Sequence, residues 1–281
     1  DKFSLEVIGG YAHSDIAYGY DEDWVFSGFH PFEYSSTDRY FRDRETVSGE
    51  IRLLSSESGA LLGGRTSWVA GIYSLHQDVD LDRNYTFLDD IYSSRFIIDR
   101  LAFYAETNTT LSDNLSLDVG LRSERFSAEF MDSNDLLFSP DENLLGGKIS
   151  LNYQLSDSGL LYLSASRGYK SGGFNTDGSL DADLREFDSE TLWNYEAGLK
   201  KSFLDNQLNL RLAVFYMDRT DVQISSSTVR MRNDGSSEFI DFIGNAAAGT
   251  NRGAEPEGQW LASDFVTLYG SLGLLDSRYE N

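Results

Sequence analysis

The sequence predicts an all-β chain, folded as an antiparallel up-and-down transmembrane β-barrel of which about 12 strands are present. Three observations lead to this prediction. Apolar and polar residues alternate with a period of two, the alternating segments are long, and the connections between them alternate between short and long. The first observation alone is not decisive, because alternation is also typical of a soluble sheet with one buried face.

The segment 114–126, NLSLDVGLRSERF, shows the alternation most clearly. Successive side chains of a strand point to opposite faces, so this segment has one apolar and one polar face. The apolar face consists of Leu115, Leu117, Val119 and Leu121, and the polar face of Ser116, Asp118, Gly120 and Arg122. In a soluble β-sandwich the leucines would line a core, whereas in a membrane barrel they would face lipid. We expect the leucines to face lipid, and Asp118 and Arg122 to face the barrel interior.

Similar segments recur along the whole chain, and many have about ten residues or more. Strands of globular proteins typically have about five or six residues, whereas about 9–11 tilted residues cross a bilayer. The lengths therefore favour a membrane barrel. We expect strands at 2–13, 40–54, 62–76, 96–110, 114–126, 145–155, 159–169, 193–200, 208–216, 240–249, 251–262 and 264–276. Pro256, inside one of these segments, predicts a bulge or a sheet edge there.

The connections between these segments are of two kinds that alternate along the chain. An outer-membrane barrel has tight turns on one side and long loops on the other, whereas a Greek-key sandwich has no reason to keep its long loops at one end. The order of the connections is therefore the strongest indication of a barrel in the residues themselves. The short connections are 55–59, 111–114, 155–159, 204–207 and 262–265, and the long ones 14–39, 77–95, 127–143, 170–187 and 218–238.

Aromatic residues fall mostly near the ends of the expected strands. Interfacial girdles of a membrane barrel have this distribution, although aromatic residues are common in any strand. We expect a girdle from Trp68, Tyr73, Tyr92, Phe96, Phe126, Tyr169, Phe187, Trp193, Phe203, Phe215, Tyr216 and Trp260.

Composition excludes several classes of protein. The chain has 46 acidic and 23 basic residues and a net charge of −23, so it lacks the basic stripe of a nucleic-acid-binding protein. It has no cysteine, and neither a disulfide framework nor a thiolate metal site is therefore possible. No run of about 18 apolar residues occurs, so no transmembrane helix is predicted.

Four motifs follow one another in the second half of the chain. They are SASRGYKSGGFN (164–175), NYEAGLK (194–200), QLNLRLAVFYMDRTDVQ (207–223) and GNAAAGTNRGAEPEG (244–258). In this order they resemble the C-terminal half of the barrel of TonB-dependent outer-membrane receptors. EIRLLSS (50–56) and WVAGIYSLHQD (68–78) resemble a mid-barrel pair of the same family. The resemblance covers nearly the whole chain and is specific as an ordered set.

Members of this family are 22-stranded barrels whose lumen is filled by a plug domain. The resemblance implies that residues 1–281 are a middle to C-terminal part of such a barrel domain, without the plug and the terminal strands. It further implies a location in the bacterial cell outer membrane, contact with outer-membrane lipid, and TonB–ExbB–ExbD as partner through the plug region. The implied function is the TonB-energised uptake of a ferric siderophore or another large, scarce solute, without a resident cofactor.

The polar faces of the strands contain the residues expected to face the lumen or the plug. They are Asp118, Arg122, Glu124, Glu196, Lys200 and Arg211. For any single one of them, an ordinary polar residue on a hydrated wall is the simpler interpretation, and this alternative stays open. Solute contacts are expected from the long external loops, because binding residues concentrate on loops held by a rigid scaffold. The candidates are Tyr169, Lys170, Phe174 and Asn175.

The segment DVDLDRN, residues 78–84, spaces three carboxylates at alternate positions. Calcium loops have such a spacing, and Asp78, Asp80 and Asp82 are weak candidates for a loosely held Ca²⁺. Arg83 occupies the place of the glycine that an EF-hand requires, so a solvated acidic loop is the simpler interpretation.

No catalytic site is predicted. The chain has three histidines, and no G-x-S-x-G nucleophile elbow occurs. Paired carboxylates are abundant, but this is unavoidable among so many acidic residues. His30 and His76 lie on or beside expected external loops and would ligate haem iron if the solute were haem. The alternative to the receptor is a soluble, secreted β-sandwich that binds a ligand or mediates adhesion.

Overall fold

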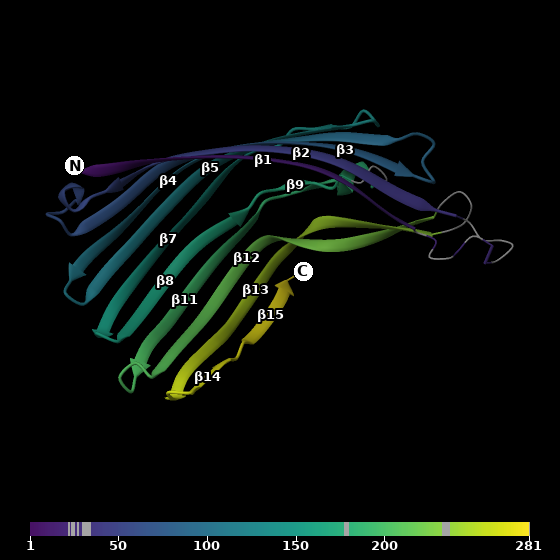
Figure 1. The fold of residues 1–281 in the computed structure, drawn as a ribbon. Coiled ribbons are helices and arrows are strands. Elements are labelled where there is room, and N and C mark those ends of the chain that lie inside the picture. Colours follow the sequence, from purple (N-terminus) through teal and green to yellow (C-terminus); the bar gives the residue numbers. More distant parts are fainter. Residues whose placement is uncertain are drawn as a thin grey trace.

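The computed structural model describes residues 1–21, 23, 26, 28–29, 35–176, 180–231 and 237–280. Most of them lie in one antiparallel sheet, in which each long strand pairs with the preceding and following long strand. Figure 1 shows this sheet as a curved, open trough with β1 and β15 at opposite edges. The order is β1-β2-β3-β4-β5-β7-β8-β11-β12-β13-β14, and β15 also pairs with β13. The all-β, antiparallel, up-and-down fold expected from the sequence is confirmed.

The elements alternate in direction along the sheet, and helical structure in the described residues is limited to two single turns. The long strands are β1 (Phe3–Asp21), β2 (Thr37–Ser55), β3 (Thr66–Tyr85), β4 (Tyr92–Ser112), β5 (Leu115–Asp132), β7 (Asp141–Ser156), β8 (Gly159–Lys170), β11 (Glu190–Phe203), β12 (Leu208–Met231), β13 (Ser237–Ser263), β14 (Val266–Ser271) and β15 (Leu274–Glu280). The short elements are β6 (Leu137–Phe138), β9 (Gly173–Phe174), β10 (Glu186–Phe187), η1 (Glu57–Gly59) and η2 (Ala182–Leu184). Among the described residues no helix is long and apolar enough to span a membrane.

Four of the expected short turns are confirmed, at 113–114, 157–158, 204–207 and 264–265. We call the end of the sheet with these turns the lower end; it lies at the left and bottom of Figure 1. The expected alternation of short and long connections is only partly right. The lower connection 56–65 has ten residues, whereas the upper connection 86–91 has six.

Most of the expected long loops are wrong, because the strands continue into them. β12 and β13 remain paired up to Met231 and Ser237, so the expected loop 218–238 is mainly the upper part of a hairpin. The expected strands 240–249 and 251–262 are likewise one strand, β13. Each strand continues beyond its apolar alternation, because the backbone hydrogen bonds between strands do not require that either face be apolar. The sequence pattern therefore indicates the apolar part of each strand and not its full length.

Cross-strand neighbours point to the same face, so the register divides the side chains into two sets. Leu117, Leu151, Leu163, Ala197 and Val214 form one continuous row across β5, β7, β8, β11 and β12. This outer face is apolar and open: Leu121 is 63% exposed and Leu163 is 55% exposed. The apolar rows form a band across the lower part of the outer face, which we call the belt. The expected separation of Leu115–Leu121 from Asp118 and Arg122 is confirmed, and the β-sandwich is wrong, since no second sheet covers the belt in the described part.

The expected aromatic girdle is right for some residues and wrong for others. Trp193 and Tyr216 lie on the outer face, where Trp193 is opposite Arg167 and Tyr216 is opposite Tyr195. Phe96 and Phe126 instead lie on the inner face, where they contact other side chains of this chain. A position near a strand end does not determine the face, because the face depends on whether the position is odd or even within the strand.

Pro256 lies inside β13, opposite Leu212 of β12. On the other side of β13, β14 and β15 share one register but are separated at Leu272 and Gly273. Proline has no N–H to donate to a neighbouring strand, and the carbonyl oxygen of Pro256 accepts one hydrogen bond from the Leu272 N–H at 3.0 Å. Pro256 thus interrupts the adjacent strand rather than forming a bulge or an edge, and β14 and β15 are two halves of one strand.

The main hydrophobic cluster lies on the inner face at the upper end of the sheet. It consists of Phe126, Ala128, Phe130, Leu144 and Phe174, with Phe96, Ile98, Phe138 and Tyr169 packed against it. Phe126 and Phe130 come from β5, above the last belt residue on that strand. In the part of the chain that the structure describes, this upper-end cluster is the main core, beside the connections that the sequence predicts to carry function.

Candidate functional site

The connection between β8 and β11 is described at residues 171–176 and 180–189. These residues fold onto the inner face of the trough, and we call them the inner strap (Figure 1). Within it β9 pairs with β10, which closes the strap into a short hairpin. Gly172 is required for this close approach, since a Cβ atom there would lie 2.6 Å from the carbonyl oxygen of Phe187. The strap thereby covers part of the wall that the long strands form.

Phe174 anchors the strap in the hydrophobic cluster. Its ring centroid lies 5.0 Å from that of Phe138 and 5.8 Å from those of Phe96 and Phe130. The side chain is buried, and burying a phenylalanine stabilises by about 1.5–3 kcal/mol. Contacts of this size hold the strap against the strands β4 and β5.

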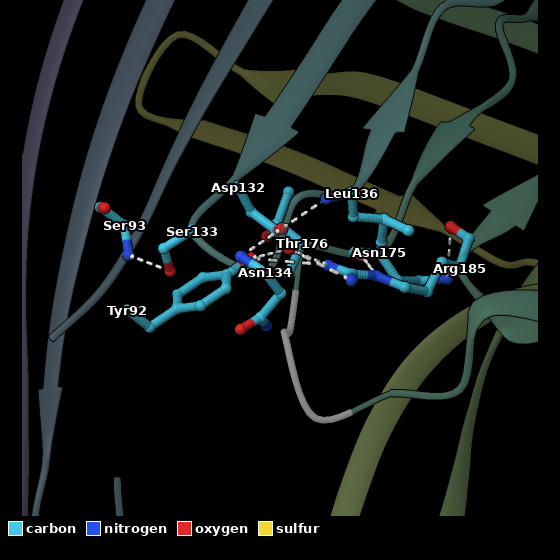
Figure 2. Close-up of polar contacts among 9 residues, drawn as sticks. All are labelled: Tyr92, Ser93, Asp132, Ser133, Asn134, Leu136, Asn175, Thr176 and Arg185. Atoms are coloured by element: carbon cyan, nitrogen blue, oxygen red, sulfur yellow. Dashed lines mark hydrogen bonds and ion pairs between the residues drawn. The ribbon is translucent and has the colours of Figure 1, made fainter. Parts of the chain in front are cut away.

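A buried ion pair joins the strap to the top of β5 (Figure 2). Arg185 Nη2 lies 3.2 Å from Asp132 Oδ2, and the two side chains are 3% and 0% exposed. Asp132 Oδ1 accepts the backbone N–H groups of Asn134 and Leu136, at 2.9 and 3.1 Å. Both carboxylate oxygens are therefore hydrogen-bonded, which a buried charge requires.

Tyr92, the first residue of β4, completes this buried network above the belt. Its hydroxyl lies 3.0 Å from Asp132 Oδ2 and 3.0 Å from the carbonyl oxygen of Thr176 in the strap. Burial, reinforced by the neighbouring charge of Asp132, raises the pKa of Tyr92 to about 12. The tyrosine is thus held neutral, as a donor between the strand and the strap.

Asn175 ties the opposite side of the strap to β13. Its Oδ1 accepts the backbone N–H of Ile243 at 2.7 Å, and its Nδ2 donates to the carbonyl oxygen of Ile243 at 2.8 Å. Gln223 of β12 adds a bond from its Nε2 to the carbonyl oxygen of Ser171 at 2.9 Å. The strap is therefore bonded to the β4–β5 side and to the β12–β13 hairpin at once.

A second charged cluster lies on the inner wall below the strap. Glu124 of β5 is 3% exposed and receives Arg100 Nη1 at 2.7 Å and Arg122 Nη2 at 2.6 Å. The hydroxyl of Tyr169 lies 3.1 Å from Glu124 Oε2, and Arg100 Nη2 donates to Ser171 Oγ at 2.9 Å. Two guanidinium groups on one carboxylate leave this cluster with a net positive charge.

The other residues expected to face the lumen also lie on the inner face, farther down the sheet. Asp118 accepts hydrogen bonds from Asn152 Nδ2 at 2.8 Å and from Asn108. Glu196 accepts the Tyr162 hydroxyl at 2.5 Å, and Lys200 Nζ lies 5.5 Å from the centroid of the same ring. Arg211 forms a long pair with Glu257, at 3.8 Å. The six residues share one face but do not converge on one site, and their contact with a plug stays a prediction.

The four expected solute-contact residues divide into two pairs. Phe174 and Asn175 are buried in contacts within the chain, so they position the strap. Tyr169 is half-buried and bonded to the Glu124 cluster, and Lys170 is exposed at the top of β8. Contact of these residues with a solute stays a prediction.

Sequence reasoning missed an inner-face cluster at the top of β1–β3. The rings of Tyr18 and Tyr40 stack at 4.9 Å, and buried Asp38 accepts Arg83 Nη2 and the Tyr40 hydroxyl, both at 2.8 Å. The segment 14–39 was expected to be a loop, so the alternation of faces was not applied to it. That alternation is the signal that would have found these residues.

Two arginines follow Tyr40 on the inner face of β2. Arg42 pairs across the sheet with Leu81, and Arg44 with Val79. Neither forms an ion pair with a carboxylate of the described residues. The chain as a whole has a net charge of −23, so Arg42 and Arg44 are local positive charges on the inner wall.

The expected calcium loop is wrong, because residues 78–84 lie within β3. Alternate strand residues are about 6.6–6.8 Å apart, so Asp78, Asp80 and Asp82 form a column along the outer face and do not converge. Asp78 is paired with Arg95, whose Nε lies 3.0 Å from its Oδ1. In the described part of the chain, no three acidic or histidine side chains are placed to hold a metal ion.

His76 also points to the outer face, where its Nδ1 lies 2.8 Å from Asp99 Oδ1. It is thus directed away from the inner strap and from the inner-face arginines. His30, the other expected haem ligand, lies outside the described residues.

Known proteins share both the sequence pattern and the fold. The pesticin receptor of Yersinia pestis is 25% identical over 256 residues, which cover 85% of this chain and 36% of that protein. The crystal structure of the ferric yersiniabactin uptake receptor FyuA from Yersinia pestis has a TM-score of 0.77 at 18% identity, over all of this chain and 41% of that one. The alcaligin outer-membrane receptor FauA from Bordetella pertussis has a TM-score of 0.64 at 16% identity, over 98% and 44% of the two chains.

The chain spans about a third of the length of the curated relatives that it matches. The family described as TonB dependent receptor-like, beta-barrel, matches residues 1–280, nearly the whole chain. This chain is accordingly located in the bacterial outer membrane, where the apolar belt faces lipid. The chain therefore belongs to the TonB-dependent receptor β-barrel family.

Proposed function

We propose that the chain is part of a receptor that takes up a ferric siderophore or a comparable large, scarce solute across the outer membrane. The names of its relatives support this proposal, since they include a ferric yersiniabactin uptake receptor and a probable TonB-dependent siderophore receptor. Residues 1–281 would form part of the barrel wall of that receptor. Its energy would come from the TonB–ExbB–ExbD complex, acting on a plug inside the barrel, and the wall itself would carry no catalytic site.

The observation that carries the proposal is the inner face at the upper end of the sheet. There the strap covers the wall, and Arg42 and Arg44 have no carboxylate partner among the described residues. The chain as a whole is strongly acidic, so unneutralised arginines on this face favour a solute with negative charge. Ferric chelates with carboxylate or catecholate groups have such a charge.

The shared fold does not select the solute. A copper transporter, OprC, has a TM-score of 0.69 with this chain, close to that of several siderophore receptors. Function resides in particular side chains on a common scaffold. We propose that Lys170 and Tyr169 of β8 contribute to solute contact at the strap, in addition to the two arginines of β2, while Phe174 and Asn175 act by positioning the strap.

The test is uptake of radiolabelled iron, supplied as a series of different ferric chelates, by bacteria that contain or lack the gene. We expect uptake of at least one chelate to disappear with the gene and with an uncoupler of the proton gradient. The double variant R42Q/R44Q of the intact protein is expected to restore this uptake only weakly. R125Q is the matched control, because Arg125 lies on the outer face and is paired with Asp141. Unchanged uptake of every chelate without the gene would reject the proposal.

A further inference from the structure

The outer face of β7, β8, β11 and β12 contains a shallow apolar groove of about 720 Å³. Its outward-facing lining comes from the belt. The groove is lined by Leu117, Ile149, Leu151, Leu163, Ala165, Tyr195, Ala197, Val214 and Tyr216 among others. It is therefore distinct from the inner-face clusters described above.

Two alanines produce the groove. Ala165 lies between Ile149 and Tyr195 in one cross-strand row, and Ala197 lies between Leu163 and Val214 in the next row. The two small side chains are diagonal neighbours on adjacent strands, so together they leave a depression between large apolar residues. We call this depression the alanine groove.

Arg167 lies directly above the alanine groove. It is two residues beyond Ala165 on the same face of β8, between Gly147 and Trp193 in its own row. Its Nη1 donates to the backbone carbonyl of Leu145. A guanidinium group has five N–H donors, so most of its hydrogen-bonding capacity remains available beside the groove.

Three other outward arginines near the top of the belt are neutralised. Arg95, Arg125 and Arg252 pair with Asp78, Asp141 and Asp276 respectively. Arg167 has a neutral carbonyl in place of a carboxylate, and no described acidic residue pairs with it. Its full charge is thus retained at the level where Trp193 and Tyr195 stack, at 6.1 Å. Stacked aromatic residues at a belt edge are typical of the headgroup level of a membrane.

We propose that the alanine groove binds one acyl chain of an anionic phospholipid of the surrounding bilayer, whose phosphate is held by Arg167. The groove is continuous with the belt, so an acyl chain is the occupant that already surrounds it. Arginine matches phosphate by geometry as well as by charge. The remainder of this acidic chain repels anionic lipid, which makes Arg167 a local binding point. The proposal does not depend on which solute the receptor takes up.

The test uses the intact protein in nanodiscs of phosphatidylcholine that contain a minor fraction of lipid with brominated acyl chains. Bromine quenches tryptophan fluorescence on contact, and the signal of Trp193 is the difference between wild type and W193F. We expect brominated phosphatidylglycerol to quench Trp193 at a concentration about fivefold lower than brominated phosphatidylcholine, the effect of one basic residue at an anionic lipid surface.

Two variants separate the headgroup from the acyl chain. R167Q is expected to abolish the preference for phosphatidylglycerol, whereas R125Q, at an ion-paired arginine of the same face, keeps it. A165L/A197L fills the groove and is expected to reduce quenching by both brominated lipids, while A70L on β3 leaves it unchanged. A preference that persists in R167Q, or quenching that persists in A165L/A197L, would overturn the proposal.

Discussion

The upper and lower ends of this sheet are built from the same strands but are stabilised differently. At the lower end β5 has leucines on an open outer face, and Asp118 on an open inner face bonds to neighbouring amides. At the upper end the same strand buries Phe126, Phe130 and Asp132 beneath the inner strap. The lower end therefore depends on its surroundings to cover its apolar face, whereas the upper end contains its own core.

This difference indicates how the two ends respond to substitution. At the lower end, the free energy of unfolding lost on a substitution depends mainly on the lipid outside the sheet. At the upper end it is set by contacts between the strap and the wall, and those contacts are buried and specific. The following predictions test this division, beginning with the largest expected effect.

The largest effect is expected from D132A. It leaves Arg185 charged and buried without its partner, which costs about 3–5 kcal/mol. The strap should then separate from the wall, and hydrogen exchange of its backbone amides should increase. The control is D181A, which removes an exposed pair of the same strap with Arg230 and should cost about 0–1 kcal/mol. Equal strap exchange in both variants would contradict a strap held by the buried pair.

The next largest effect is expected from L163R on the outer face of the lower end. An arginine facing the middle of a bilayer costs about 2–4 kcal/mol in a membrane barrel. M131R is the matched change on the outer face of the upper end, where it should cost about 0–1 kcal/mol. Unfolding by urea of the intact protein in lipid vesicles measures both. Similar losses of unfolding free energy in L163R and M131R would contradict this division, because both positions would then face the middle of the bilayer.

A smaller effect is expected from N175A. The variant leaves the Ile243 N–H without its partner, and a lost partner of a partly buried group costs about 1–3 kcal/mol. Hydrogen exchange of the Ile243 amide should therefore accelerate by one to two orders of magnitude. This is about the change in exchange rate that corresponds to the free energy lost. N108A, on the open inner face of the lower end, should leave exchange of its neighbouring amides nearly unchanged. If Ile243 remains protected in N175A, the strap is not clamped to β13.

The smallest effect concerns pH. The pKa of Tyr92 is raised from its ordinary value of 10.0 to about 12 by burial and by Asp132. The unfolded chain therefore releases this proton first, so the contribution of Tyr92 is complete below pH 10 and falls as the pH rises to about 12. The loss of strap protection over this range should be smaller in Y92F than in wild type. If strap protection has the same pH dependence in Y92F and in wild type, the loss at alkaline pH is caused by a group other than Tyr92.

The sequence predicted the lower end well and the upper end poorly, for a physical reason. The alternation of Leu117, Val119 and Leu121 with polar residues follows directly from contact with lipid on one face, and period-two patterns report it. Asp132 and Arg185 are distant in the chain, and neither residue type nor spacing indicates that they meet in a buried pair. Tyr18 and Asp38 were missed because their segment, 14–39, was assigned to a loop.

The residues expected to contact the solute also show that a sequence motif does not reveal contacts between distant segments. The motif 164–175 drew attention to Phe174 and Asn175, but a motif does not indicate which of its residues turn toward the wall. The buried ring of Phe174 and the bonds of Asn175 to Ile243 depend on strands that are far away in the sequence. Arg42 and Arg44 carry no motif, and only the register places them on the inner face.

The central claim is that the odd positions of β5 from Leu115 to Leu121 face lipid and the even positions face the interior. The chain has no cysteine, so single cysteines at 116, 117, 118, 119 and 121 can each carry a spin label in the intact, membrane-embedded protein. We predict that labels at 117, 119 and 121 collide with oxygen, which concentrates in lipid, and labels at 116 and 118 with a water-soluble nickel chelate. Equal accessibility of the two sets, or the reverse pattern, would contradict the account.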